Sequence, residues 1–184
     1  MAEGKIVKSL SGFYYVSRDE DKTIYQCRGR GNFRKRKITP LVGDHVVFES
    51  SNETDGYILE IRERRNELVR PPIANVDQAL TIFSLKEPDL NLQLLDKFLV
   101  HLEASDITPI ICFTKTDLLS REELEHARKM QAQYELIGYV TILISVINRE
   151  GIDGVYSSLR DKVTVVAGQS GVGKSSLLNA LDPT

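Results

Sequence analysis

The feature that most constrains this 184-residue chain lies close to its end, where residues 168–175 read G-Q-S-G-V-G-K-S. The spacing G-x-x-x-x-G-K-S is that of a phosphate-binding loop. A β-branched run precedes it and a helical pattern follows it, which is the strand–loop–helix context that such a loop requires. The glycines let the backbone curl so that successive N–H groups face one anion, and the helix start adds a positive dipole end. A merely flexible glycine turn would not require Lys and Ser at this spacing.

Two side chains of this loop carry most of the expected chemistry. Lys174 is expected to bring a point charge to the β- and γ-phosphates, and the Ser175 hydroxyl to ligate Mg²⁺. Lys174 and Ser175 are therefore the predicted catalytic residues, and Ser175 is the predicted metal ligand. The rest of the loop is expected to contact phosphate as well, through Gly168, Gln169, Ser170, Gly171, Val172, Gly173 and Ser176.

Strand and helix patterns alternate from residue 78 onward, which favours a parallel sheet with crossover helices. The predicted strands are apolar runs at residues 78–84, 108–113, 140–146 and 163–167. The predicted helices lie at residues 90–104, 120–138, 152–159 and 175–181. Ser120 and Glu123 form a capping box at the start of the second helix, and Gly138 is placed to end it. Ligands of such sheets bind at the carboxyl ends of the strands.

One of those strand ends is followed by T-K-T-D, residues 114–117. The Asp117 carboxylate can accept from two parallel donors, and guanine presents such a pair in its N1–H and 2-amino group, whereas adenine does not. The aliphatic stem of Lys115 can lie along the base. By itself the motif could be a turn that starts the next helix. Together with the phosphate loop on a neighbouring strand, it predicts a guanine-nucleotide site that includes Thr114, Lys115, Thr116 and Asp117.

Ser145 follows a further apolar strand, where GTPases often place a short Ser-Ala-Lys segment that meets the guanine O6. Val146 and Ile147 do not match that segment. Ser145 is therefore a candidate base contact, and a strand-end serine without a ligand role is an equally good interpretation.

The charge of the chain differs between its two parts. Residues 1–70 hold 14 Lys and Arg against 11 Asp and Glu, whereas residues 71–184 hold 10 against 15. We therefore predict two domains, residues 1–70 and residues 71–184. In the first, strand-like runs at 5–16 (bent at Gly12), 23–28, 45–49, 57–61 and 68–70 fit a five-stranded closed barrel of the OB type.

The segment R-G-R-G-N-F-R-K-R-K, residues 28–37, joins two of these runs and holds six cationic side chains. Loops of this kind on small barrels bind RNA, with an aromatic ring for base stacking. The predicted RNA-binding residues are Arg28, Arg30, Phe33, Arg34, Lys35, Arg36 and Lys37. A solvated charge run is the alternative. Arg62, Arg64 and Arg65 either extend this basic patch or only flank the linker.

Other signals point to the cytoplasm. Cys27 and Cys112 are too few for a disulfide framework or a metal site, and the three histidines lack ligand spacing. The first ten residues mix charged and apolar side chains, unlike a secretory leader. No apolar stretch approaches the roughly 20 residues needed to span a bilayer.

In ordinary small GTPases the phosphate loop precedes the base motif, whereas here Thr114 to Asp117 comes before residue 168, so the order is circularly permuted. A basic β-domain, the linker N-E-L-V-R-P-P-I-A-N-V-D-Q-A-L, the base motif and the loop G-Q-S-G-V-G-K-S-S occur in one chain. This combination resembles the ribosome small-subunit-dependent GTPases, the family called RsgA, YjeQ or YloQ. The resemblance implies GTP hydrolysis stimulated by the small ribosomal subunit, a role in its late maturation, and rRNA and guanine nucleotide as partners. It implies a cytoplasmic protein without a membrane partner, and we expect a monomer.

The resemblance also implies parts that would follow residue 184: a switch threonine that contacts Mg²⁺, a D-T-P-G motif and a zinc-binding helical domain. Turnover of GTP by residues 1–184 alone is therefore not expected, and the Zn²⁺ ligands are expected beyond them. Thr114 stands where many GTPases have Asn, the side chain that usually ties the base loop to the phosphate loop, and its shorter side chain is expected to lower nucleotide affinity. Two alternatives remain: an ATP-binding module of another phosphate-loop class, and an RNA-binding module whose nucleotide domain binds GTP without hydrolysing it.

Overall fold

The computed structural model describes residues 1–31, 33 and 38–182, and the chain forms two compact units, Met1–Val76 and Asp77–Thr184. The boundary predicted after residue 70 falls inside the first unit, between its last two short strands. No helix within the described ranges has the length and apolar character that a membrane crossing needs.

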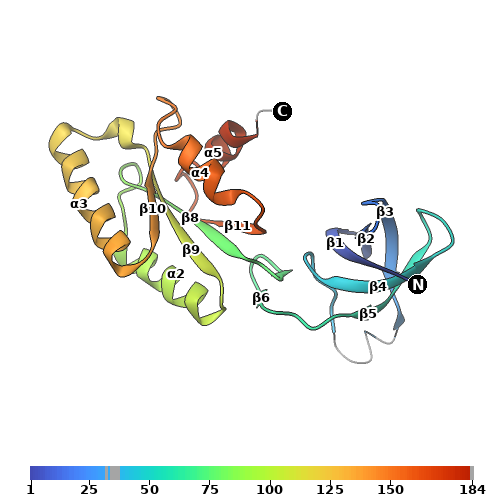
Figure 1. Cartoon of the computed structure of the whole chain (residues 1–184). Helices are drawn as coiled ribbons and strands as arrows, with labels where there is room; N and C mark the ends of the chain where they lie inside the picture. Colours follow the sequence, from blue (N-terminus) through green and yellow to red (C-terminus); the bar gives the residue numbers. More distant parts are fainter. Residues whose placement is uncertain (32, 34–37, 183–184) are drawn as a thin grey trace. The chain divides into compact units, whose positions relative to one another are not determined.

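The first unit is a closed five-stranded barrel with strand order β1-β2-β3-β5-β4 (Figure 1). Its strands are β1 (Ala2–Leu10), β2 (Phe13–Arg18), β3 (Ile24–Gly29), β4 (His45–Ser50) and β5 (Gly56–Ile61). One side chain or more from every strand points inward to form the core, as the period-2 geometry of a strand dictates. The buried core residues are Ile6, Val16, Cys27, Val46, Phe48 and Ile58.

Two strand predictions for this barrel were wrong, although the strand count was right. The run at residues 5–16 is not one bent strand but the hairpin β1–β2, because Ser11 (φ 50°) and Gly12 (φ 82°) both adopt positive φ. Positive φ at both central residues is the tight turn that matches strand twist in two-residue hairpins. The run at 68–70 does not join the barrel, since β6 (Glu67–Leu68) pairs with β7 (Ile73–Ala74) instead.

An ion pair between Asp44 and Arg64 links the segment before β4 to the segment after β5. Asp44 is fully buried and accepts from Arg64 Nε at 2.7 Å, from Arg64 Nη2 at 2.8 Å and from the Leu41 N–H at 2.7 Å. Arg64 Nη2 also donates to the Thr39 carbonyl at 2.8 Å. The pair therefore ties residues 39–44, which follow the basic loop, to the segment after β5.

The neighbouring arginines are also engaged within the unit. Arg62 contacts Glu3 at 2.5 Å and Glu60 at 2.9 Å, and Arg65 donates to the Val76 carbonyl at 2.9 Å. These contacts favour the second interpretation of Arg62, Arg64 and Arg65, in which they flank the linker and do not extend the basic patch.

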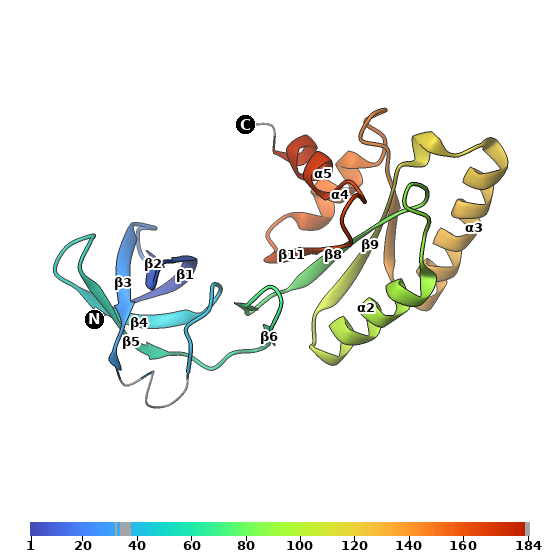
Figure 2. The same cartoon turned by 180° about the vertical axis from the view of Figure 1, so that it is seen from behind.

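The second unit is a four-stranded parallel sheet with strand order β10-β9-β8-β11. Its strands are β8 (Gln78–Ser84), β9 (Thr108–Thr114), β10 (Val140–Leu143) and β11 (Thr164–Ala167). Its helices are α2 (Leu92–Ala104), the 3₁₀ turn η1 (Thr116–Leu118), α3 (Arg121–Ile137), α4 (Ile152–Leu159) and α5 (Lys174–Leu181). Helices α2 and α3 cover one face of the sheet, and α4 and α5 the other (Figures 1 and 2).

The alternation of side chains along the central strands explains the two layers. Leu80 and Ile82 of β8 point into the core with α4 and α5, whereas Phe83 of β8 and Phe113 of β9 point to α2 and α3. Every residue of β8 is buried, as a central parallel strand requires. The predicted strands and helices are present, but β10 ends at Leu143, three residues before the predicted end at 146.

Local signals set the ends of α3 as predicted. Ser120 and Glu123 form both hydrogen bonds of the capping box. Gly138 ends the helix with φ 113°, in the left-handed region that favours glycine.

Candidate nucleotide-binding site

The phosphate loop joins the carboxyl end of β11 to the start of α5, and its glycines are required by its backbone. Gly171 and Gly173 have φ 81° and 96°. At Gly168 (φ 156°) a Cβ atom would lie 2.4 Å from the Ile82 carbonyl oxygen. The Val172 side chain is 1% exposed and packs in the core with α4 and α5, which anchors the loop while its backbone stays at the surface.

The donors of this loop are arranged for an anion. The backbone N–H groups of residues 169–173 donate no hydrogen bond within the described part of the chain. Lys174 Nζ donates to the Gly168 carbonyl at 2.7 Å and to the Gln169 carbonyl, so the ammonium lies across the loop. Free N–H groups at a helix start, beside an ammonium, form the usual cradle for phosphate. The hydroxyl-bearing Ser175 and Ser176 are exposed next to it.

The base motif follows β9 at the same edge of the sheet. Lys115 takes a left-handed conformation (φ 64°), and the Thr116 N–H donates to the Ile144 carbonyl at 3.2 Å. This turn places Asp117 in η1, where its carboxylate is half-buried. The turn therefore places the Asp117 carboxylate at the carboxyl end of β9, the position that the sequence predicts for a base-recognition residue.

Ser145 positions that carboxylate. Its side chain is fully buried, and its hydroxyl donates to Asp117 Oδ1 at 2.7 Å while accepting from the Asn148 N–H at 3.0 Å. The first bond orients the Asp117 carboxylate, and the second holds the Ser145 hydroxyl in place. The observed contact of Ser145 is thus with the predicted base-recognition side chain, 28 residues away in sequence.

Thr114 links the base motif directly to the phosphate loop. Its hydroxyl donates to the Val172 carbonyl at 2.6 Å, and both residues are buried, 2% and 1% exposed. Although it is shorter than asparagine, the Thr114 side chain reaches the phosphate loop, because the end of β9 lies close to it; the expected loss of nucleotide affinity stays a prediction. The observed bond joins residues 58 positions apart.

Thr114→Val is therefore expected to weaken the nucleotide site. Valine keeps the shape but leaves the buried Val172 carbonyl without its partner, at a cost of about 1–3 kcal/mol. GDP titration should show a severalfold loss of affinity, and amide exchange in residues 168–173 should accelerate. Thr114→Ser, which keeps the hydroxyl, is the control and should retain most of the affinity. Equal affinities for both variants would show that the bond has no part in binding.

The loop between β8 and α2 completes the site, and the sequence analysis did not identify it. The Glu87 carbonyl accepts from Lys115 Nζ, and the Pro88 carbonyl accepts from the Ser84 hydroxyl at 2.6 Å. The ring of Pro88 also lies 3.9 Å from the position of a Cβ on Gly171. The place of this loop at the carboxyl end of β8 was the available signal, because parallel strands end at the same edge of the sheet.

The predicted RNA-binding residues of the barrel lie partly outside the described residues, namely Arg34, Lys35, Arg36 and Lys37. Arg28 stacks over the Phe13 ring at 4.8 Å, and Arg30 pairs with Glu49 at 2.5 Å. Phe33 is half-buried against the barrel core. Its role as a stacking ring stays a prediction.

The two cysteines are structural in character. Burial raises the pKa of Cys27 to about 11 and that of Cys112 to about 12, so both thiols are protonated at neutral pH. A protonated thiol is neither a good nucleophile nor a metal ligand. Across the described ranges, no group of three or more His, Cys, Asp or Glu side chains could hold a metal ion.

Comparison with known families decides the family of the chain. Residues 61–184 match the model described as RsgA GTPase, and residues 3–58 match the model described as RsgA N-terminal domain. The chain belongs to the RsgA GTPase family. It is 57% identical over 183 residues to the small ribosomal subunit biogenesis GTPase RsgA of Halalkalibacterium halodurans, and 56% identical over 187 residues to that of Bacillus subtilis strain 168.

Each of these alignments covers 100% of this chain and 62% of the RsgA relative, so the chain spans less than two thirds of their length. Solved structures give the same fold. YloQ, described as a circularly permuted GTPase, is similar with a TM-score of 0.87 and 52% identity, over 100% of this chain and 65% of YloQ. YjeQ from Thermotoga maritima has a TM-score of 0.91 and 32% identity, over 99% and 65%. The predicted barrel followed by a circularly permuted GTPase fold is confirmed.

Proposed function

We propose that this chain binds GTP and GDP at the edge of the sheet where β9 and β11 end. The observation that carries the proposal is the Thr114–Val172 hydrogen bond, because it joins the base motif at residues 114–117 to the glycine-rich loop at residues 168–175. Asp117 would accept from the base, and the loop from Gly168 to Ser176 would donate to the phosphates.

The residues around the phosphates fit this role. An ammonium has three donors, and two of those on Lys174 point at loop carbonyls, which leaves one for a phosphate oxygen. Ser175 offers a neutral hydroxyl oxygen, the kind of ligand that Mg²⁺ accepts beside phosphate and water. When bound, Mg²⁺ would neutralise charge on the β- and γ-phosphates. The role of the chain is to hold the triphosphate in one orientation.

A pair of titrations tests the nucleotide assignment. Labelled GDP should be retained on a filter by this chain and displaced by unlabelled GDP, while ADP at the same concentrations should not displace it. Displacement by ADP as effective as by GDP would favour the alternative of an ATP-binding module, and would leave Asp117 without a role in base selection.

We further propose that the protein hydrolyses GTP in the cytoplasm and acts with the small ribosomal subunit and its rRNA in the maturation of that subunit. The names of the RsgA relatives, which are small ribosomal subunit biogenesis GTPases, support this assignment. Lys174 and Ser175 are the proposed catalytic residues of this chain. For zinc, which the family resemblance implies, we propose no ligand among the residues that the structure describes.

The basic loop of the barrel is proposed as the rRNA contact. Reversing Arg34, Lys35, Arg36 and Lys37 to Glu should weaken association with the small subunit by about tenfold or more and flatten its salt dependence. Each lost phosphate contact removes a slope of roughly 0.7–0.9 in a plot of log affinity against log salt. Sedimentation with purified subunits at several salt concentrations measures both quantities.

The control for this variant is GDP affinity, which should not change because the loop belongs to the other unit. Subunit binding that is as strong and as salt-dependent as that of the unaltered chain would reduce residues 28–37 to a solvated charge run.

A further inference from the structure

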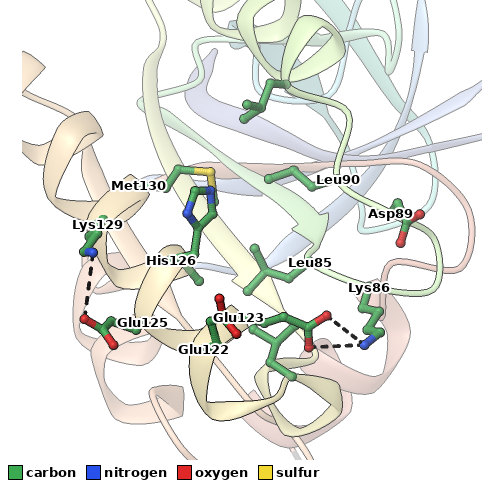
Figure 3. Close-up of a pocket in the computed structure, with 13 residues that line it drawn as sticks. Leu85, Lys86, Asp89, Leu90, Glu122, Glu123, Glu125, His126, Lys129 and Met130 are labelled. Carbon is green, nitrogen blue, oxygen red and sulfur yellow. Dashed lines mark hydrogen bonds and ion pairs between the residues drawn. The ribbon is translucent and has the colours of Figure 1, made fainter.

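A groove separate from the nucleotide loops opens on the α2–α3 side of the second unit, with a volume of about 700 Å³ (Figure 3). One wall is a face of α3, where Glu122, His126 and Met130 recur at a spacing of four residues. The other wall is the β8–α2 loop and the first residue of α2. Figure 3 shows Met130 and His126 facing Leu90 and Leu85 across the groove. This volume is in the usual range for ligand sites in proteins.

The floor of the groove is apolar and continuous with the core between the sheet and α2. Leu85, Leu90 and Met130 are partly buried and pack against that core, and Leu92 is 45% exposed at one end. The exposed parts of these apolar side chains can contact an apolar group of a ligand without any change in the packing of the core. The floor therefore suits one bulky apolar side chain of an occupant.

The rim of the groove is acidic. Glu123 pairs with Lys86 at 3.0 Å, and Glu125 pairs with Lys129 at 3.8 Å. Accepted hydrogen bonds from the Ser120 N–H and from Lys86 lower the pKa of Glu123, so it stays ionised. Asp89 and Glu122 line the same groove with no ion pair within the described ranges. The excess of negative charge repels RNA phosphates and attracts cations.

The β8–α2 loop connects this groove to the nucleotide site. Leu85 lines the groove, and its N–H donates to the Thr114 carbonyl at 3.1 Å. Lys86 and Asp89 line the groove, while between them Glu87 accepts from Lys115 and Pro88 approaches Gly171. The β8–α2 loop thus lines the groove with some of its residues and contacts the base motif and the phosphate loop with others.

We propose that this groove binds a basic peptide segment that carries a bulky apolar side chain, and that its occupation changes nucleotide affinity through the β8–α2 loop. The apolar side chain packs on Leu85, Leu90 and Met130, and flanking cationic side chains pair with Asp89 and Glu122. The second half of the proposal rests on the nucleotide site proposed above, whereas the first half does not.

The binding test uses a fluorescein-labelled hexapeptide amide, Lys-Arg-Leu-Phe-Arg-Lys, and fluorescence anisotropy with this chain in the absence of nucleotide. Replacing Leu-Phe by Ser-Ser should weaken binding at least about tenfold, the expected effect of losing a buried apolar side chain. Replacing the four cationic residues by Glu should abolish binding. Equal binding of the three peptides, or none by the first, overturns the proposal.

A charge-matched pair of variants places the binding in the groove. Glu122→Lys should weaken the basic peptide by about fivefold, the upper range for an exposed ion pair. The double substitution Ala132→Lys and Gln133→Lys adds the same net charge at exposed positions of α3 that do not line the groove, and it should have little effect. Equal losses in both variants would mean diffuse attraction to an acidic surface, and would overturn the site.

Nucleotide coupling is measured on the same samples. Saturating peptide should change GDP affinity by about fivefold or more, and GDP should change peptide affinity by the same factor, because coupling free energies are reciprocal. Peptide binding without any change in GDP affinity would overturn the coupling and leave the docking site standing. Failure of GDP to bind at all would instead count against the proposed function, since the peptide test needs no nucleotide.

Discussion

Asp117→Asn is expected to reverse the base preference of the nucleotide site. The substitution replaces one carboxylate oxygen by an NH₂ group that would face the 2-amino group of guanine, so two donors oppose each other. A polar group left unsatisfied in a partly buried site costs about 1–3 kcal/mol, and more when a charged partner is lost, so GDP affinity should fall by about tenfold or more. Xanthine carries an oxygen in place of that amino group, and xanthosine diphosphate (XDP) should bind better than it does to the unaltered chain.

Ser145 decides which way the new amide points. Its hydroxyl donates to Asp117 Oδ1 at 2.7 Å, so the oxygen of an asparagine should keep that bond and turn the NH₂ group toward the base. Adding Ser145→Ala to Asp117→Asn removes this preference, and the gain in XDP affinity should shrink. The two contacts together predict a change of about a hundredfold in the GDP/XDP ratio for Asp117→Asn.

Titrations of GDP and XDP on the unaltered chain and both variants measure this prediction. Asp161→Asn, a carboxylate-to-amide change at a side chain that is 94% exposed, is the control and should leave both affinities unchanged. If Asp117→Asn weakened GDP and XDP alike, Asp117 would only hold its loop together, and the guanine assignment would lose its chemical basis.

Asp44→Ala should destabilise the barrel by about 3 kcal/mol, the lower part of the range for breaking a buried ion pair. Asp44 is fully buried, while Arg64 is 22% exposed and would recover some hydration. Arg64 stays charged in the variant, because a guanidinium does not lose its proton in proteins. The substitution also frees residues 39–44, which anchor the end of the basic loop.

Hydrogen exchange read by mass spectrometry reports the two units separately and suits this test. Amides of the barrel core, such as that of Ile6, should exchange about a hundredfold faster, because 1.4 kcal/mol corresponds to a factor of ten. Peptides from residues 77–182 should be unaffected. Glu67→Ala removes the more exposed partner of Arg64 and should cost less than about 1 kcal/mol. If Asp44→Ala lowered the stability of the barrel by as little as Glu67→Ala, the Asp44–Arg64 ion pair would contribute little to the fold.

Much of the second unit follows from local signals in the sequence. The continuous apolar run of β8 predicts a central strand, and the capping box and Gly138 predict both ends of α3. These signals work because they depend on residues within one or two turns of one another. The residue types of the proposed nucleotide site also come from the sequence, since the motifs at residues 114–117 and 168–175 indicate their chemistry by spacing alone.

The barrel shows where such signals fail. The hairpin at Ser11 and Gly12 lies inside one long run of strand-like sequence, and only the positive φ of both residues separates β1 from β2. The run at residues 68–70 has strand-like composition, yet β6 pairs with β7 outside the barrel. Strand composition favours an extended chain but does not choose the partner, because pairing depends on contacts between segments far apart.

The sequence by itself therefore determined the class of fold, the permuted order of the motifs and the chemical groups offered to a guanine nucleotide. Tertiary structure decided how those groups are joined: Thr114 to Val172, Ser145 to Asp117, and the β8–α2 loop to both nucleotide loops and to the groove beside α3. The hydrogen bonds among these contacts link residues 28 to 58 positions apart, and Pro88 and Gly171 are farther apart still. Their distances depend on how strands and helices pack, which neither residue spacing nor periodicity records.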